Sequence, residues 1–121
     1  MMTGTLAERL SGIRAAHELE LAMVCLDGVV LGVDARAEID ADRVGQTASD
    51  LVLLMRVIGA EMDRGSLRMS ILEYEGGTLV VTHLPTGEDL LLLSAETVNV
   101  GRVRMAARRF RESYEKSGVM A

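Results

Sequence analysis

Apolar residues recur at three- and four-residue spacing between residues 44 and 62, and this pattern predicts one long helix over residues 40–65. Asp40 is the expected N-cap, and Gly65 is expected to take the left-handed conformation just past the end. Gly59 lies in the apolar stripe, where the missing side chain would allow a close approach to a sheet. The stripe consists of Val44, Ala48, Leu51, Val52, Met55, Ile58 and Met62.

A second apolar set falls on roughly the opposite side of this helix, where a helix on the surface of a monomer should be polar. It consists of Leu53, Leu54, Val57 and Ala60, and the charged residues that border it are Asp50, Arg56, Glu61 and Arg64. Scattered aliphatic residues are common on protein surfaces, which is one interpretation of this set. The interpretation that we favour is that a second copy of the chain or a partner buries this face.

The rest of the chain predicts two more helices and five strands. The helices are expected over residues 5–17 and 100–114, and the strands over 19–26, 29–33, 67–74, 78–84 and 89–94. The element order is α-β-β-α-β-β-β-α. It indicates a single α/β (α+β) domain over residues 1–121, a three-layer α/β/α sandwich. A five-stranded antiparallel sheet would carry the long helix on one face and the two outer helices on the other.

Local signals support these boundaries. Thr5 and Glu8 have the spacing of a capping box at the start of the first helix. Asp27-Gly28 is typical of a two-residue hairpin turn, because both of its positions need positive φ. Leu90–Leu93 is apolar on both faces, which indicates a central strand covered on both sides. The strand that begins at Leu67 alternates instead, as an edge strand would. We therefore predict a dimer interface that combines the second apolar set with three residues of this strand, Arg68, Met69 and Ile71.

Charge and composition narrow the possible functions. The net charge is −5, which argues against a general binder of nucleic acid or of anionic membranes. Residues 98–121 carry +4, however, so residues 1–97 carry −9. No apolar run approaches the ~20 residues that span a bilayer, and the start of the chain has no apolar signal core. The one Cys fits a reducing compartment, so we expect a cytoplasmic protein.

No group of residues points to conventional catalysis. The chain lacks a GxxxxGK[ST] loop, a GxSxG elbow and a Cys/His cluster with metal-ligand spacing, so we expect no enzyme activity, cofactor or metal. The carboxylate pairs Asp40/Asp42 and Glu88/Asp89 lie at a helix start and a turn, where capping explains them. Among the single candidates, His17 is expected to cap the first helix, His83 to be hydrogen-bonded structure and Cys25 to be a small buried hydrophobe.

The last helix carries five arginines that are expected to face outward, namely Arg102, Arg104, Arg108, Arg109 and Arg111. The residues expected to face the sheet are Val100, Val103, Ala107, Phe110 and Tyr114. Thr97 or Asn99 can cap this helix. An Arg-rich surface is compatible with two interpretations. The arginines can be solvated or satisfied by nearby acidic side chains, or they can meet an acidic protein partner.

The segment LPTGEDLLLLSAETVNVGRVRMAARRFR, residues 84–111, resembles the closing segment of the roadblock family of dynein light chains and their prokaryotic relatives. A glycine-containing turn, an aliphatic strand and an Asn-x-Gly turn into an Arg-rich helix follow one another in the family pattern. Asp27-Gly28 resembles the family's hairpin, and Ala48 falls at the usual small position of its long helix. The later turns match at Gly65, Glu75-Gly76-Gly77 and Gly87. Residues 13–18 depart from the pattern, because they lack the Pro and Gly of the family's first helix-to-strand turn.

This resemblance implies a roadblock/profilin-like fold and a dimer in which two copies join the edge strand and the long helix. It also implies a Ras-like small GTPase as partner, regulated by remodelling of the GTPase's own loops and without an arginine finger. Asp50, Arg56, Glu61 and Arg64 are then the predicted partner contacts. Two alternatives stay open: a scaffold dimer without effect on nucleotide turnover, and a small-ligand sensor. Neither nucleic acid nor a membrane is an expected partner.

Overall fold

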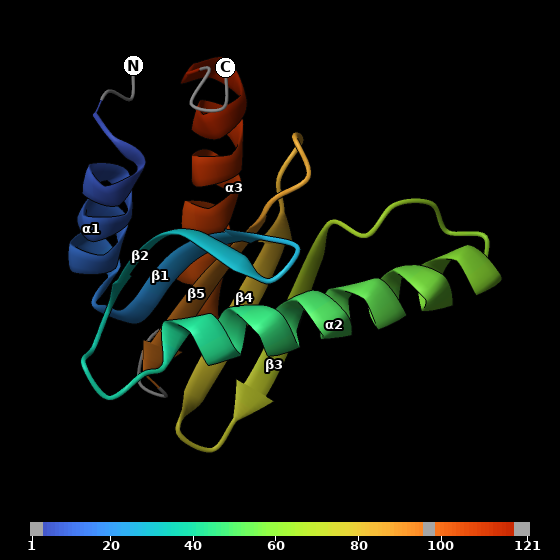
Figure 1. Ribbon diagram of the computed structural model, residues 1–121, viewed down its shortest axis with the longest axis horizontal. Helices are drawn as coiled ribbons and strands as arrows, with labels where there is room; N and C mark the ends of the chain where they lie inside the picture. Colours follow the sequence, from blue (N-terminus) through green and yellow to red (C-terminus); the bar gives the residue numbers. More distant parts are fainter. Residues whose placement is uncertain (1–3, 96–98, 118–121) are drawn as a thin grey trace.

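The computed structural model describes residues 4–95 and 99–117 of the chain, which form three helices and five strands (Figure 1). The helices and strands are α1 (Leu6–His17), β1 (Leu19–Leu26), β2 (Val29–Ala35), α2 (Ala41–Glu61), β3 (Met69–Tyr74), β4 (Gly77–His83), β5 (Asp89–Ala95) and α3 (Val100–Ser117). The sheet is antiparallel throughout, in the order β2-β1-β5-β4-β3. The predicted element order and the predicted edge position of β3 are confirmed.

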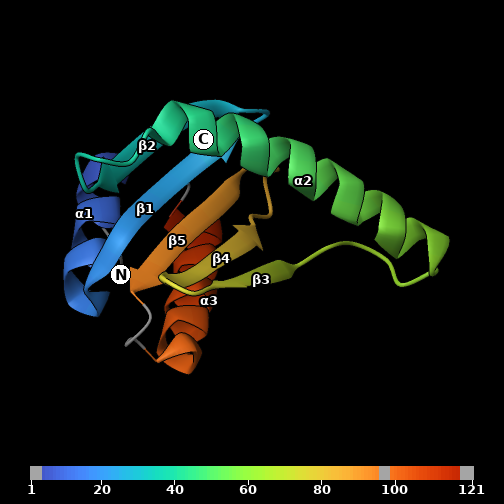
Figure 2. The same ribbon diagram turned by 90° about the horizontal axis from the view of Figure 1, so that it is seen from below.

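The sheet separates two apolar clusters, which confirms the three-layer arrangement (Figure 2). α1 and α3 cover one face, over a cluster that includes Leu10, Ala22, Val24, Leu90, Leu92, Val103 and Phe110. α2 covers part of the other face. Its residues Ala48 and Val52 belong to a second cluster, together with Leu21, Met23, Cys25, Val81 and Leu91. Leu90 and Leu91 therefore point to opposite layers, as the continuous apolar run of β5 predicted for a central strand.

The first helix and its junction with β1 differ in one detail from the prediction. The capping box of Thr5 and Glu8 is present. His17 does not cap the end as expected, because its Nδ1 is buried without a hydrogen-bond partner among the described residues. The N–H of Glu18 bonds to the last carbonyls instead, and Glu18 takes the left-handed conformation, with φ 54°. The turn thus forms without Pro or Gly. The left-handed conformation costs a residue other than glycine roughly 1–2 kcal/mol.

α2 begins as predicted and ends earlier than predicted. The side chain of Asp40 accepts a hydrogen bond from the N–H of Arg43 at 3.2 Å. The helix ends at Glu61 because Asp63 already takes the left-handed conformation (φ 55°), before Gly65 does so (φ 78°). Arg64 therefore lies outside the helix.

Gly59 serves the end of α2 and not a contact with the sheet, which corrects our expectation. Its carbonyl accepts from the N–H of Arg64 at 3.0 Å. A Cβ at Gly59 would lie 3.4 Å from the carbonyl oxygen of Gly65. The missing side chain thus leaves room for the loop that folds back on the helix end.

The hairpin turns also follow the sequence signals. Asp27 and Gly28 both have positive φ, 49° and 84°, and join β1 to β2. β3 begins at Met69, two residues later than expected, although the carbonyl of Arg68 still accepts from the N–H of His83 at 3.0 Å. Glu75 and Gly76 form the turn from β3 to β4. The sheet thus has two edges, β2 and β3.

Candidate functional site: an apolar face and a groove on the α2 side

The second apolar set of α2 is exposed, as predicted. The exposed fractions of Leu53 and Leu54 are 61% and 63%, and Val57 and Ala60 are exposed with them. Figure 2 shows the cause: α2 starts over β2 and β1, and its second half projects past the sheet. The described part of this chain does not cover that half, which exposes several apolar side chains bordered by charged ones. Such a surface is typical of a binding site.

The first stripe of α2 is only partly buried, which corrects the prediction that all of it faces the core. Ala48 and Val52 are buried, Val44 and Met55 pack against the same cluster, and Leu51 is half-buried. Ile58 and Met62, in contrast, have exposed fractions of 52% and 57%, because no strand lies beneath them. They extend the exposed apolar surface around the projecting half of the helix.

A groove with a volume of about 660 Å³ lies next to the first half of α2. α2 crosses β1 and β2, which leaves part of the face formed by β3, β4 and β5 uncovered. The apolar residues of the groove include Leu21, Val44, Ala48, Leu51, Leu72, Leu79 and Leu93. Its charged residues are Glu20, Arg36, Asp40 and Arg43, of which Glu20 and Arg36 form an ion pair. The groove is therefore apolar with a charged rim.

Two of the three residues predicted for the interface, Met69 and Ile71, lie on the face of β3 opposite α2. Ile71 pairs with Val80, which belongs to the cluster under α1 and α3, and Met69 packs against that cluster. Arg68 is exposed just before the strand. Leu72, which we did not select, lies on the α2 side and lines the groove. The alternation of β3 identifies two faces, but it does not indicate which face meets α2.

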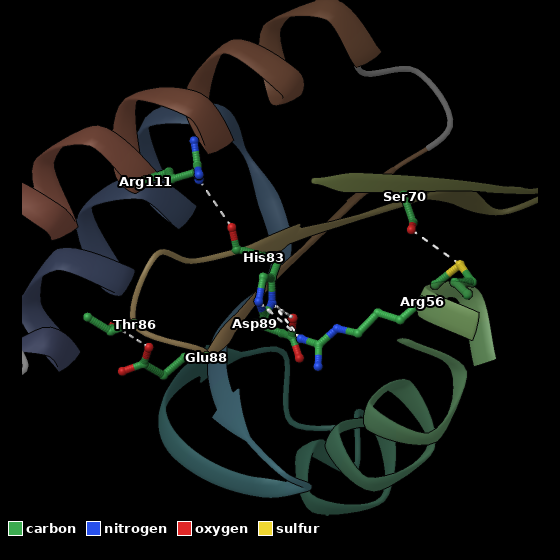
Figure 3. Close-up of polar contacts among 8 residues, drawn as sticks. Arg56, Ser70, His83, Thr86, Glu88, Asp89 and Arg111 are labelled. Atoms are coloured by element: carbon green, nitrogen blue, oxygen red, sulfur yellow. Dashed lines mark hydrogen bonds and ion pairs between the residues drawn. The ribbon is translucent and has the colours of Figure 1, made fainter. Parts of the chain in front are cut away.

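Arg56 is exposed and also contacts His83 on β4, so its role as a partner contact stays a prediction (Figure 3). Its Nη2 lies 2.8 Å from Nδ1 and 3.1 Å from Nε2 of His83. His83 Nδ1 donates to Asp89 Oδ1 at 3.0 Å, which leaves Nε2 to accept from the guanidinium. This network joins α2 to the ends of β4 and β5. It confirms His83 as hydrogen-bonded structure. The other predicted contacts, Asp50, Glu61 and Arg64, are exposed.

The Glu88/Asp89 pair is buried and does not act as a turn cap. Glu88 is 0% exposed and accepts hydrogen bonds from the hydroxyls of Thr86 and Tyr114. Asp89 is 6% exposed and accepts from His83. Arg111, which we expected to face outward, donates from Nε to the carbonyl of His83 at 3.2 Å (Figure 3). These contacts hold α3 and α2 to one end of the sheet.

Asn99 caps α3, since its Oδ1 accepts from the N–H of Gly101 at 2.8 Å. Thr97, the other candidate cap, lies outside the described residues. Of the residues expected to face the sheet, Val103, Ala107, Phe110 and Tyr114 are buried, and Val100 is half-buried.

The described residues offer no reactive thiol and no metal site. Cys25 is fully buried, and burial, with a smaller contribution from the Asp89 carboxylate, raises its pKa to about 11. Its thiol is therefore protonated near neutral pH. Residues 4–95 and 99–117 contain no group of three or more His, Cys, Asp or Glu side chains that could hold a metal ion. Within the same ranges, no helix is both long enough and apolar enough to cross a membrane.

No family model matches the chain, and no curated protein matches it. Solved structures do match. A Roadblock/LC7 domain from Streptomyces avermitilis is 23% identical, and the match covers 98% of this chain and 100% of that chain with a TM-score of 0.86. The chain has the roadblock/LC7 fold.

Two further structures share the roadblock/LC7 fold. The gliding protein MglB from Thermus thermophilus is 16% identical, with a TM-score of 0.84 over 100% of this chain and 96% of that chain. MglB from Myxococcus xanthus is 11% identical, with a TM-score of 0.79 over 91% of this chain and 94% of that chain. At this identity the likeness establishes the roadblock fold, in agreement with the pattern of residues 84–111.

Proposed function

We propose that this chain is a homodimeric, non-enzymatic regulator of a Ras-like small GTPase, of the activating or effector type. The observation that carries the proposal is that the chain has both an exposed apolar half of α2 and an open apolar groove. The GTPase as partner rests on the resemblance of the sequence to the roadblock family. The similarity in fold to the gliding protein MglB is consistent with it.

The helix half and the groove are complementary in a two-fold dimer. The second half of α2 exposes Leu54, Val57, Ile58 and Met62, and the groove beside the first half exposes aliphatic side chains of three strands. Two antiparallel copies of α2 would place each projecting half over the groove of the other copy. This arrangement is isologous, so it closes at two subunits.

The free edge of β3 adds backbone hydrogen bonds to the same dimer. Among the strands of residues 4–95 and 99–117, β3 pairs with β4 alone, so its other edge presents N–H and C=O groups that no described strand pairs. An exposed edge of this kind is a template for pairing with another strand. Pairing of two β3 strands would continue one sheet through both subunits and place Arg68, Met69 and Ile71 at the junction. We expect a buried area on the order of 1,200–2,000 Å².

Dimerisation would bring together two copies of the charged residues that border the second apolar set. Asp50, Glu61 and Arg64 are exposed and able to contact a GTPase, whereas Arg56 would be positioned by His83. Charged contacts at a rim affect the association rate and its salt dependence more than the total affinity. In this proposal the chain supplies no catalytic group, and the effect on turnover comes from the loops of the GTPase.

The groove also favours a second candidate, a small-ligand sensor. Its volume of about 660 Å³ falls within the usual range for small-molecule sites, roughly 300–1,000 Å³. Dimerisation through the groove and ligand binding in it exclude one another. A scaffold dimer differs from the regulator only in its lack of effect on nucleotide turnover.

The decisive experiment measures binding to a Ras-like small GTPase loaded with GDP or with a non-hydrolysable GTP analogue. We expect tighter binding to the GTP form, because a regulator has to distinguish the two states. Single-turnover GTP hydrolysis is then measured with and without this protein. Equal binding and unchanged hydrolysis would leave the scaffold, and absence of binding would overturn the GTPase proposal.

Charge-reversal variants locate the contact. Glu61→Lys and Arg64→Glu should slow association and alter its salt dependence. Glu112→Lys, which makes the same charge change as Glu61→Lys on α3, is the matched control, because α3 lies on the other face of the sheet. Equal effects of Glu61→Lys and Glu112→Lys would mean that only net charge matters and that the contact lies elsewhere.

A further inference from the structure

The outward face of α3 carries four exposed arginines in two rows. At about 3.6 residues per turn, Arg104 and Arg108 follow one side of this face, and Arg102 and Arg109 follow the other. Arg111 does not belong to either row, since it bonds to the carbonyl of His83. The four residues span eight positions, or about 10 Å along the helix axis. We refer to Arg102, Arg104, Arg108 and Arg109 as the arginine rows.

The arginine rows form no ion pair within the described residues, although the exposed Glu112 follows Arg109 and Arg108 by three and four residues on the same helix. The ion pairs of the described residues involve Arg14, Arg36 and His83, and none includes a member of the rows. Arg104 and Arg108 are also four residues apart on one helix, where like charges destabilise by about 0.2–0.5 kcal/mol. The interpretation that acidic neighbours satisfy these arginines is therefore not supported within the described part of the chain.

Between the rows lies a short uncharged strip, which ends at the exposed Glu112 about one turn after Arg108. Gly101 and Met105 occupy its middle, and Met105 has an exposed fraction of 47%. Methionine is an adaptable apolar side chain that is common at protein-binding surfaces. An apolar centre with arginines around it has the composition of a protein interface, in which Met and Arg are enriched. A helix that is only solvated has no need of this arrangement.

We propose that the arginine rows and Met105 form a docking surface for an acidic amphipathic helix of a partner protein. The apolar side chains of the partner helix would pack on Met105 and on the space beside it, where Gly101 has no side chain. Carboxylates on both sides of the partner's apolar stripe would pair with the two rows. Arginine suits this role because its planar guanidinium binds carboxylates with two parallel hydrogen bonds. The charge of the chain favours a protein over nucleic acid. Residues 1–97 carry −9 in total, so a long polyanion that extends beyond α3 meets repulsion.

This surface is separate from the proposed dimer and GTPase surfaces. α3 covers the face of the sheet opposite α2 (Figures 1 and 2), and the four residues of the arginine rows are exposed. A dimer through α2 would therefore leave two copies of the surface free. The chain could then hold an acidic partner and a GTPase at the same time. The inference does not depend on the identity of the α2 partner.

The experiment uses designed peptides and the full chain. The first probe is a 21-residue helical peptide with leucines on one face and glutamates on both sides of them. Two control peptides accompany it, one with lysine in place of every glutamate and one with the acidic sequence scrambled so that no apolar face forms. We expect the acidic amphipathic peptide to bind, with an affinity that falls as salt rises. The lysine peptide should not bind, and the scrambled one should bind more weakly.

Substitutions assign the binding to α3. The double variant Arg104→Ala/Arg108→Ala should weaken binding roughly tenfold, because each exposed ion pair contributes a few-fold. Met105→Ala should weaken it severalfold at unchanged charge. Arg108→Ala is compared with Ser66→Glu, which makes the same change in net charge in an exposed loop remote from α3 and should have little effect. Circular dichroism confirms that each variant is folded.

Three outcomes would overturn the proposal. The first is failure of the acidic peptide to bind at millimolar concentration. The second is equal binding of that peptide to the Arg108→Ala and Ser66→Glu variants. The third is binding of a 20-base-pair DNA duplex or of vesicles with anionic lipid, with the same dependence on the arginine rows and no effect of Met105→Ala. That result would identify a general polyanion surface. None of these outcomes bears on the GTPase experiment, so the two proposals fail separately.

Discussion

The hydroxyl of Tyr114 on α3 donates to Oε2 of Glu88 at 3.1 Å, and both side chains are buried. This bond ties the far part of α3 to the turn between β4 and β5. Burial first, and the Glu88 carboxylate second, raise the pKa of Tyr114 to about 12. The bond therefore affects both stability and its dependence on alkaline pH.

Tyr114→Phe should lower the free energy of unfolding by about 1–3 kcal/mol, because a buried carboxylate loses a donor. In the wild-type protein, Tyr114 ionises near pH 10 in the unfolded state, whereas in the folded state it keeps its proton to about pH 12. Stability should thus fall as pH rises through this window, and the variant should lack that component. Urea unfolding at pH 8 and pH 11 measures both effects. Tyr74→Phe, at a tyrosine that is 61% exposed, is the control and should change little.

Gly77→Ala should prevent stable folding. A Cβ at Gly77 would lie 2.2 Å from the carbonyl oxygen of Ser94, a backbone atom in the middle of the sheet. We expect a loss of about 3 kcal/mol or more, since neither strand can move without breaking its pairing. Gly76→Ala is the matched control, because a Cβ there meets no atom within 4 Å. Similar melting temperatures for the two variants would contradict this account of β4–β5 packing.

Cys25 should react with a thiol reagent only after denaturation. The side chain is fully buried, and its pKa of about 11 leaves almost no thiolate at pH 8. Absorbance after addition of a chromogenic disulfide gives the rate in buffer and in denaturant. A protein with Ser66→Cys in the exposed loop supplies the rate of an accessible thiol. Labelling of native Cys25 at that rate would reopen a redox or nucleophilic role.

Leu53→Arg with Val57→Arg should convert the dimer to a monomer or cause aggregation, because the charges would be buried where two α2 helices meet. Light scattering with size-exclusion chromatography measures the mass. Val29→Arg places a charge on β2, at a side chain that is 63% exposed and far from the projecting half of α2, and should leave the dimer intact. A dimer that survives the double substitution would place the interface elsewhere.

The pKa of His17 should report on the arginine rows. Burial, then Arg102 and Arg109, lower it below its usual value of 6.5. Protonation therefore favours the unfolded state, and this contribution to stability is lost as pH falls through the folded-state pKa. Arg109→Ala should raise the pKa in an NMR titration, whereas Arg104→Ala, in the other row, should have a smaller effect. Equal effects of the two variants would contradict the placement of Arg109 near α1.

Short-range patterns were sufficient to predict the elements of this fold. The period of the apolar residues identified α2 and the central strand β5. The Thr5 box marked the start of α1, and Asp27-Gly28 marked the turn between β1 and β2. These signals depend on residues a few positions apart, whose geometry is the same in any helix or hairpin. The exposed second apolar set of α2 was predictable for the same reason, because helical spacing alone separates its two faces.

The contacts between elements came only from the tertiary structure. Arg56 joins His83, Glu88 is buried against Tyr114, and Arg111 turns inward, although each lies on a segment that reads as surface or turn. The partners in these contacts are 26 to 28 residues apart, and the packing angles of helices on the sheet decide whether they meet. The groove arises in the same way. Its depth depends on where α2 leaves the sheet, and local periodicity carries no information about that position.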